Sequence, residues 1–186
     1  MEIYVIRHTT PDITKGICYG QSDLDLVKNY NEEFGIVKSK ISNTEGFKVI
    51  SSPLKRCTKL AKSFSDKVIF DERLKELNFG DWELKPWNDI PEKEFNPWMT
   101  NFVNLAVPNG ESYTELALRV NHFFEELLHS ADNKNLIIIT HAGPIRAFLA
   151  NLLKVELKDS FNIKINYGDV FKLKKEDNTF KLLTPI

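Results

Sequence analysis

The sequence predicts an α/β fold with three layers, α/β/α, around a mainly parallel sheet that has an antiparallel edge. Short apolar runs alternate along the 186 residues with stretches of helical periodicity, which is typical of a layered α/β protein. The run from Leu136 to Thr140 is unbroken, as in a strand buried on both faces of a parallel sheet. The last two apolar runs flank Asp177 and Asn178, which indicates a hairpin at a sheet edge. No repeat or linker interrupts this order, so we expect residues 1–186 to form one domain.

The first half of the chain begins with a short strand from Ile3 to Ile6, because these residues favour β structure and a buried position. Residues 7–28 lack periodicity and are expected to form a long loop. A weak helical pattern follows over 29–41, and a strand is expected over 47–51. Ser52 and Pro53 then favour a helix start, with Ser52 as the N-cap and Pro53 at the first helical position.

The second half contains the strongest helix, which we expect over 113–129 because Ser112 and Glu115 fit a capping box before an amphipathic run. A strand over 67–70 precedes it, and the residues between, 71–110, are expected to be irregular and rich in aromatic side chains. After the strand over 136–140, the chain turns at His141 into a helix that carries apolar residues to Leu152. The terminal hairpin is expected over 170–173 and 180–183.

The composition is that of an ordinary globular protein, with 42% hydrophobic and 27% charged residues. A net charge of -1 gives no basic field, which argues against broad nucleic-acid binding and membrane-surface attraction. Cys18 and Cys57 form no CxxC pair and indicate no disulfide framework. No signal peptide is recognisable, and no apolar run approaches the roughly 20 residues that span a bilayer. We therefore expect a cytoplasmic protein with a small-molecule partner, and leave its oligomeric state open.

Residues suited to phosphoryl chemistry stand where predicted elements end or begin. Arg7 and His8 follow the first strand, His141 follows the strand over 136–140, and Arg56 lies one turn into the second helix. Glu76 precedes the aromatic segment. Because ligands bind at the carboxyl ends of parallel strands, we expect these side chains to share one site.

These residue types match the needs of a phosphate ester. Arginines supply bidentate donors, and a helix N-terminus adds backbone N–H groups. Arginine charge close to His8 would disfavour its protonation and keep a lone pair free to attack phosphorus. Glu76 could then protonate the leaving oxygen and later deprotonate water.

Each residue also has a plain structural explanation. Arg7 and His8 could be ion-pair partners at a strand end, Arg56 could be solvated on its helix, and Glu76 could be a surface glutamate. His141 could simply cap a helix. Asp23 and Asp25 could suggest a Mg²⁺ site, but no buried strand leads into them, so no metal site is predicted.

Taken together, the motifs resemble the histidine phosphatase superfamily, whose fold is that of phosphoglycerate mutase. The resemblance implies a metal-independent phosphomonoesterase without a cofactor, in which His8 is phosphorylated and Glu76 is the proton donor. It also implies that Arg7, Arg56 and His141 hold the phosphoryl group. The segments that carry it are 6–8, 20–26, 51–56, 76–83, 109–112 and 140–147.

Within the superfamily, residues 16–23 and 167–170 look most like α-ribazole phosphatases. The resemblance therefore implies removal of the 5′-phosphate from α-ribazole phosphate, a step in assembling the nucleotide loop of cobalamin. Tyr19 and Trp82 are the candidates for aromatic contacts with the base. The full set of candidate substrate-binding residues is Thr14, Tyr19, Gly20, Gln21, Ala142 and Trp82.

Three positions depart from the family pattern. Thr9 replaces a glycine, and since a threonine disfavours positive φ, we expect ordinary backbone there. Thr14 stands, by ungapped count, where an asparagine commonly contacts phosphate. Leu84 replaces the glycine after Trp-Glu, so the chain beyond Glu83 could follow a different path.

Other functions stay open. A phosphoglycerate mutase-like isomerase and a broad-specificity sugar-phosphate phosphatase would use the same residues. A non-catalytic module that binds a phosphorylated ligand would keep the pocket without turnover. Whether residues 82–104 form a mobile lid is also open.

Overall fold

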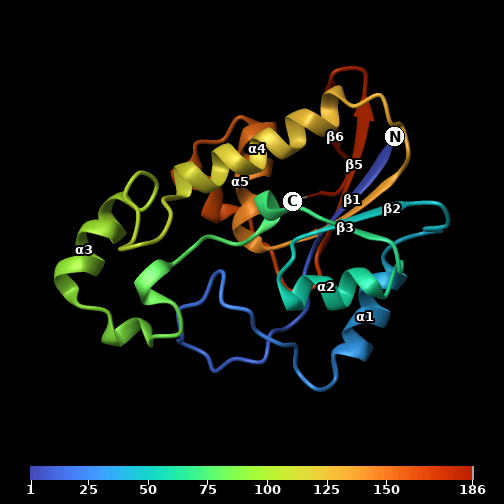
Figure 1. The fold of residues 1–186 in the computed structure, drawn as a ribbon. Coiled ribbons are helices and arrows are strands. Elements are labelled where there is room, and N and C mark those ends of the chain that lie inside the picture. Colours follow the sequence, from blue (N-terminus) through green and yellow to red (C-terminus); the bar gives the residue numbers. More distant parts are fainter. Residues whose placement is uncertain (186) are drawn as a thin grey trace.

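Six strands form one sheet in the order β3-β2-β4-β1-β5-β6 in the computed structural model, which describes residues 1–185 (Figure 1). The strands β1 to β4 are parallel to one another, whereas β5 runs antiparallel to β1 and β6 antiparallel to β5. This confirms the mainly parallel sheet with an antiparallel edge. The strands are β1 (Glu2–Arg7), β2 (Lys48–Ser51), β3 (Val68–Phe70), β4 (Leu136–Thr140), β5 (Val170–Glu176) and β6 (Thr179–Leu182).

Alternate side chains of the central strands feed two separate cores, because successive residues of a strand point to opposite faces. Ile3 of β1 and Ile138 of β4 pack with residues of α4 and α5. Ile6 and Ile139 pack with residues of α1 and α2 on the other face. Helices on both faces confirm the predicted three layers (Figure 1). The helices are α1 (Tyr30–Ser39), α2 (Lys55–Lys62), α3 (Glu92–Asn101), α4 (Tyr113–His129) and α5 (Ala142–Leu153).

The start of α4 is confirmed in detail. The Ser112 hydroxyl accepts a hydrogen bond from the Glu115 amide at 3.2 Å, and the Glu115 carboxylate accepts one from the Ser112 amide at 2.7 Å. The start of α2 is not: the prediction of Ser52 as N-cap and Pro53 as first helical residue is wrong. Leu54, which has an extended backbone, is the N-cap, and Lys55 is the first helical residue. Asp23, far away in sequence, accepts the hydrogen bond of the Lys55 amide at 2.6 Å.

The segment 71–110, expected to be irregular, contains α3 despite Pro97 in its interior. Four aromatic side chains hold it, because Phe95 and Trp98 of α3 pack with Trp82 and Trp87. We call Trp82, Trp87, Phe95 and Trp98 the aromatic cluster. It forms a core cluster separate from the two that cover the sheet, and α3, which carries two of its residues, lies away from the strands (Figure 1).

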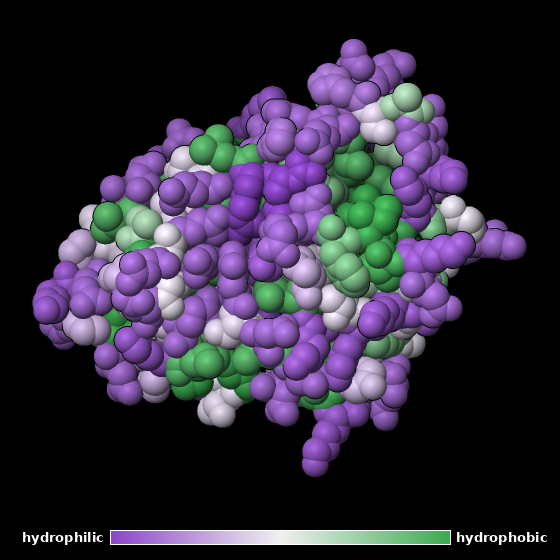
Figure 2. Space-filling view, in the orientation of Figure 1, coloured by the Kyte–Doolittle hydropathy of each residue, from purple (hydrophilic) through white to green (hydrophobic). Residues whose placement is uncertain are grey.

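Hydrophilic residues cover most of the face in Figure 2, and hydrophobic residues appear there as separate patches. Within the described part of the chain, no helix has the length and apolar character needed to cross a membrane. The predicted domain extends to residue 186, which lies outside the described residues.

Candidate active site

The carboxyl ends of β1 and β4 bring two histidines together. Arg7 is in register with Thr140, and the His8 amide donates to the Thr140 carbonyl at 3.0 Å. His8 and His141 therefore follow neighbouring strands at the same edge, with their ring centroids 5.0 Å apart. Both side chains are buried. Burial, and then the Arg56 charge, hold the pKa of each histidine well below its usual 6.5.

The proton of His8 can be assigned from its neighbour. His8 Nδ1 lies 2.7 Å from the Thr9 carbonyl oxygen, which can only accept a hydrogen bond. Nδ1 therefore carries the proton, and because the ring is neutral, Nε2 keeps a lone pair. Thr9 supplies this contact through its backbone, and it is absent from the residues with positive φ, as expected.

Arg56 is fully buried between His141 and the loop that follows Tyr19. Its Nε–H donates to His141 Nδ1 at 3.3 Å, which places the His141 proton on Nε2, 2.8 Å from the Ser52 hydroxyl. Its two Nη groups donate to the carbonyls of Gly20 and Ser22. These contacts use three of the five N–H groups that a guanidinium has, and leave two without a hydrogen bond to residues 1–185.

Arg7 precedes His8 in the chain and contacts the segment over 165–167. Its Nη1 donates to the Ile165 carbonyl at 2.8 Å, and its guanidinium carbon lies 3.8 Å from the centre of the Tyr167 ring. The Nε–H group of Arg7 is buried and has no hydrogen-bond partner within residues 1–185. Since a buried donor without a partner is costly, an anion at this place would relieve the cost.

Glu76 reaches the same region and is held by backbone N–H groups. Its Oε1 accepts from the Leu77 amide at 2.9 Å and from the Gly143 amide at 3.1 Å. A side chain on Gly143 would place its Cβ 2.2 Å from this oxygen. Only glycine allows the helix N-terminus and the carboxylate to approach this closely.

An ion pair supports the segment that carries Glu76. Arg119 of α4 contacts Glu111 through two hydrogen bonds of 2.6 and 2.9 Å. The same guanidinium donates to the carbonyls of Arg73, Lys75 and Glu76 at 2.6, 2.7 and 3.0 Å. The sequence did not indicate this role for Arg119, because only the fold brings it to the segment.

These groups meet at a cavity of about 220 Å³. His8, Arg7 and Glu76 line it, whereas Arg56 and His141 are fully buried and do not line it. The other lining residues are Tyr19, Leu77, Phe79, Tyr113, Gly143, Arg146 and Phe161.

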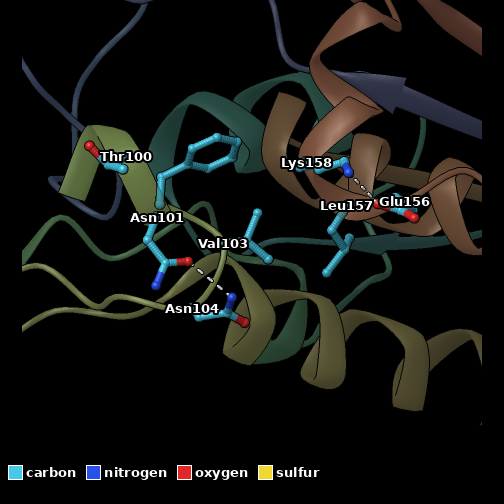
Figure 3. Close-up of a pocket in the computed structure, with 8 residues that line it drawn as sticks. Thr100, Asn101, Val103, Asn104, Glu156, Leu157 and Lys158 are labelled. Atoms are coloured by element: carbon cyan, nitrogen blue, oxygen red, sulfur yellow. Dashed lines mark hydrogen bonds and ion pairs between the residues drawn. The ribbon is translucent and has the colours of Figure 1, made fainter. Parts of the chain in front are cut away.

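A larger cavity of about 310 Å³ lies between the end of α3 and the 3₁₀ helix of Leu157–Asn162. Its polar side chains are engaged with one another: Asn104 donates to Asn101 at 3.0 Å, and Glu156 pairs with Lys158 at 2.8 Å (Figure 3). None of the residues that line it is a histidine, a cysteine or an arginine. The chemistry described above belongs to the smaller cavity.

The candidate substrate-binding residues separate into three groups. Tyr19 lines the smaller cavity. Ala142 is the first residue of α5, and the amide of the next residue, Gly143, donates to Glu76. Gly20 contacts Arg56, and the Gln21 side-chain amide donates to the Glu76 carbonyl at 3.0 Å. Both residues therefore contact candidate catalytic residues without lining the cavity. Thr14 is exposed in its loop and Trp82 is buried in the aromatic cluster, and neither lines the cavity.

Six residues of the cavity wall were not predicted, and two of them, Arg146 and Tyr113, have polar side chains. Arg146 follows Gly143 by three residues on α5, so both lie on one helix face, and this spacing is the signal that could have indicated it. Tyr113 begins α4 and gave no such signal. Leu84 has a φ of 64°, in the left-handed region that favours glycine.

Asp23 and Asp25, considered for Mg²⁺, have protein partners. Asp23 caps α2, and Asp25 pairs with Lys59. Both contacts attach the loop over 20–25 to α2.

Comparisons with known proteins place these observations in a family. The model of the histidine phosphatase superfamily (branch 1) matches residues 3–185. The chain is 29% identical to "Putative phosphoserine phosphatase 2" of Hydrogenobacter thermophilus, over 94% of this chain and 89% of the relative. It is 24% identical to "Adenosylcobalamin/alpha-ribazole phosphatase" of Salmonella typhimurium, over 90% and 87%. The solved α-ribazole phosphatase of Shigella flexneri shares the fold, with a TM-score of 0.87, 20% identity, and 98% and 94% of the chains covered.

Proposed function

This chain belongs to the histidine phosphatase superfamily (branch 1), as its motifs indicated, and we propose that it hydrolyses phosphate monoesters through a phosphohistidine on His8. The observation that carries the proposal is the state of His8. The neutral ring donates from Nδ1 to Thr9 and leaves the Nε2 lone pair in a cavity that Glu76 also lines. A nucleophile and a proton donor share one small space.

In the proposed first step, His8 Nε2 attacks phosphorus in line and the bond to the ester oxygen breaks. Glu76 gives its proton to the leaving oxygen. Arg7, Arg56, His141 and the N-terminus of α5 at Ala142 stabilise the three equatorial oxygens, as electrostatic catalysis of phosphoryl transfer requires. In the second step, Glu76 takes a proton from water, which attacks the phosphohistidine. Phosphate leaves and His8 is restored.

For the substrate we propose α-ribazole 5′-phosphate, which would place the reaction in the assembly of cobalamin's nucleotide loop. The motifs over 16–23 and 167–170 and the name of the Salmonella relative support it. Aromatic side chains in the cavity wall, such as Tyr19 and Phe161, suit a flat base. We propose the cytoplasm as its location, since Cys18 and Cys57 are buried free thiols.

A second candidate is a phosphorylated acid such as phosphoserine, and Arg146 favours it. Arg146 lines the cavity and lies one helical turn after Gly143, which holds Glu76, so it lies on the side of the leaving group. Burial lowers the pKa of Arg146, and the Glu76 carboxylate opposes that shift. Nε donates to the Ile163 carbonyl at 3.2 Å, and the Nη groups could pair with a substrate carboxylate.

The test is phosphate release from α-ribazole 5′-phosphate, phosphoserine and p-nitrophenyl phosphate with EDTA present, comparing the unaltered protein with His8→Ala. We expect release by the unaltered protein alone. Turnover of 3-phosphoglycerate that depends on the bisphosphate would indicate a mutase instead. If no ester is hydrolysed but inorganic phosphate still binds, the result would indicate a binding module.

A further inference from the structure

We propose that Glu83 is a positioning residue that orients Arg56 through the loop over 20–22. The inference rests on the proposed function, in which Arg56 binds the phosphoryl group. It assigns a task to a carboxylate that lies outside the cavity and has no part in the steps above.

The Glu83 carboxylate is the common acceptor of a ring of backbone donors. The amides of Gly20, Gln21 and Ser22 donate to it at 2.9, 2.8 and 3.0 Å. The Phe79 amide at 3.1 Å and the Ser22 hydroxyl at 2.5 Å complete the ring. Burial alone would raise the pKa of Glu83, but hydrogen bonds from Ser22, Gly20 and Gln21 outweigh it and lower the pKa. The lowered pKa keeps the Glu83 carboxylate ionised at neutral pH.

Two of these three residues, Gly20 and Ser22, also present their carbonyls to Arg56. The Gly20 and Ser22 carbonyls accept from the two Nη groups, the latter at 2.8 Å. The N–H ends of the loop thus face an anion and its C=O ends face a cation. The peptide group that joins Gly20 to Gln21 lies between the two charges, with its C=O on Arg56 and its N–H on Glu83. The two charges polarise it in the same sense, so its two hydrogen bonds strengthen each other.

The loop has little room to take another path. A Cβ on Gly20 would lie 1.8 Å from the Leu77 carbonyl oxygen, so the backbone presses directly against the segment that follows Glu76. The Gln21 side chain also donates to the Glu76 carbonyl at 3.0 Å. Once Glu83 holds the three amides, the positions of the two carbonyls are set as well.

Without those carbonyls, only His141 would orient the guanidinium. Arg56 would keep its charge but lose the alignment of the two N–H groups that are free for phosphate. Misplacing a catalytic group by about 1 Å can cost about 10²-fold in rate. Glu83 follows the 3₁₀ turn of Gly80–Trp82, and Trp82 belongs to the aromatic cluster. The segment that carries α3 is thereby tied to the phosphoryl site.

The first test is Glu83→Gln, which places an NH₂ group against backbone donors. The matched control is Asp81→Asn, an exposed acid in the same 3₁₀ turn that contacts Asn109 rather than the loop. We expect kcat of Glu83→Gln to fall by about 10²-fold, equally on aryl and alkyl phosphates, because Arg56 serves every leaving group alike. We expect weaker binding of inorganic phosphate by calorimetry, and no change in either quantity for Asp81→Asn.

The second test is a double-mutant cycle with Arg56→Lys, since a role through Arg56 predicts that Glu83→Gln costs little more in that background. An equal loss in both backgrounds would overturn the inference, as would a lowered Tm with unchanged phosphate affinity. Phosphate binding keeps the two proposals apart. If no ester is hydrolysed, the proposed function fails, while the effect of Glu83→Gln on phosphate affinity still decides this one.

Discussion

The backbone N–H of Gly143 donates a hydrogen bond to the Glu76 carboxylate, at 3.1 Å to one oxygen and 3.2 Å to the other. The proposed proton donor is thus held by the N-terminus of α5, two residues after His141. One turn of chain therefore sets the position of Glu76 relative to His141. This contact leads to the first two predictions.

Replacing Glu76 with glutamine should slow esters with poor leaving groups far more than aryl phosphates. An alkoxide needs a proton as it departs, whereas p-nitrophenolate leaves without one. The measurement is kcat/KM for α-ribazole 5′-phosphate and for p-nitrophenyl phosphate in both proteins. Equal losses on the two esters would remove the assignment of Glu76 as the acid.

Gly143→Ala should reproduce the leaving-group pattern of Glu76→Gln without weakening phosphate binding. The added Cβ would lie 2.2 Å from Glu76 Oε1, so the carboxylate must move. Gly35→Ala is the control, because Gly35 is exposed on α1 and its added Cβ meets no atom within 4 Å. Gly35→Ala should leave kcat unchanged and raise stability by up to about 1 kcal/mol, measured by urea unfolding. A Gly143→Ala protein with normal rates on both esters would contradict the tight contact.

Arg146→Met should distinguish the two candidate substrates. If Arg146 pairs with a substrate carboxylate, kcat/KM for phosphoserine should fall about 10- to 100-fold, in line with about 1.5–3 kcal/mol for a charged hydrogen bond. Phosphoethanolamine has the same ester and amine but no carboxylate, so its kcat/KM should barely change. Parallel losses on both compounds would assign Arg146 a structural role and favour the α-ribazole ester.

Acid should destabilise the protein through its two buried histidines. The pKa of His8 and of His141 lies well below 6.5 in the folded state, mainly because of burial. Below about pH 6.5 the two histidines bind protons in the unfolded chain but stay neutral in the folded chain. The free energy of unfolding therefore falls on acidification. Each histidine contributes a slope of up to about 1.4 kcal/mol per pH unit.

The slope can be measured by urea unfolding between about pH 7.5 and 5.5. His8→Asn should give a shallower slope than the unaltered protein, because one of the two groups is removed. Identical slopes would show that His8 takes up its proton equally well in the folded and unfolded states.

Periodicity and motif order were sufficient for the sheet and for the residues at its edge. β4 and α4 match their predicted bounds because each carries a clear signal, an unbroken apolar run in one and a capping box in the other. α3 could not be predicted, since Pro97 argues against a helix and the packing of Trp98 on Trp82, which overrides it, is a contact of the folded state. The α2 N-cap was misplaced for a similar reason: Asp23 lies 32 positions before Lys55.

The site shows the same division. Residue types indicated His8, Glu76 and Arg56, whose roles stay predictions, but not the groups that hold them. Glu83 and Arg119 act on backbone atoms that only the fold brings to them. Trp82 was a reasonable candidate by type, yet it is buried in the aromatic cluster, because aromatic side chains suit a core as well as a ligand.

The place of β1 in the sheet determines when the site around His8 can form during synthesis. β1 is translated long before both of its partners, β4 and β5. His8 therefore has no neighbouring strand on either side until residues 136–176 have been translated. Contacts between such distant parts of a chain also slow folding. A chain that ended before residue 136 would contain His8, the proposed nucleophile, and still lack the strands that form its site.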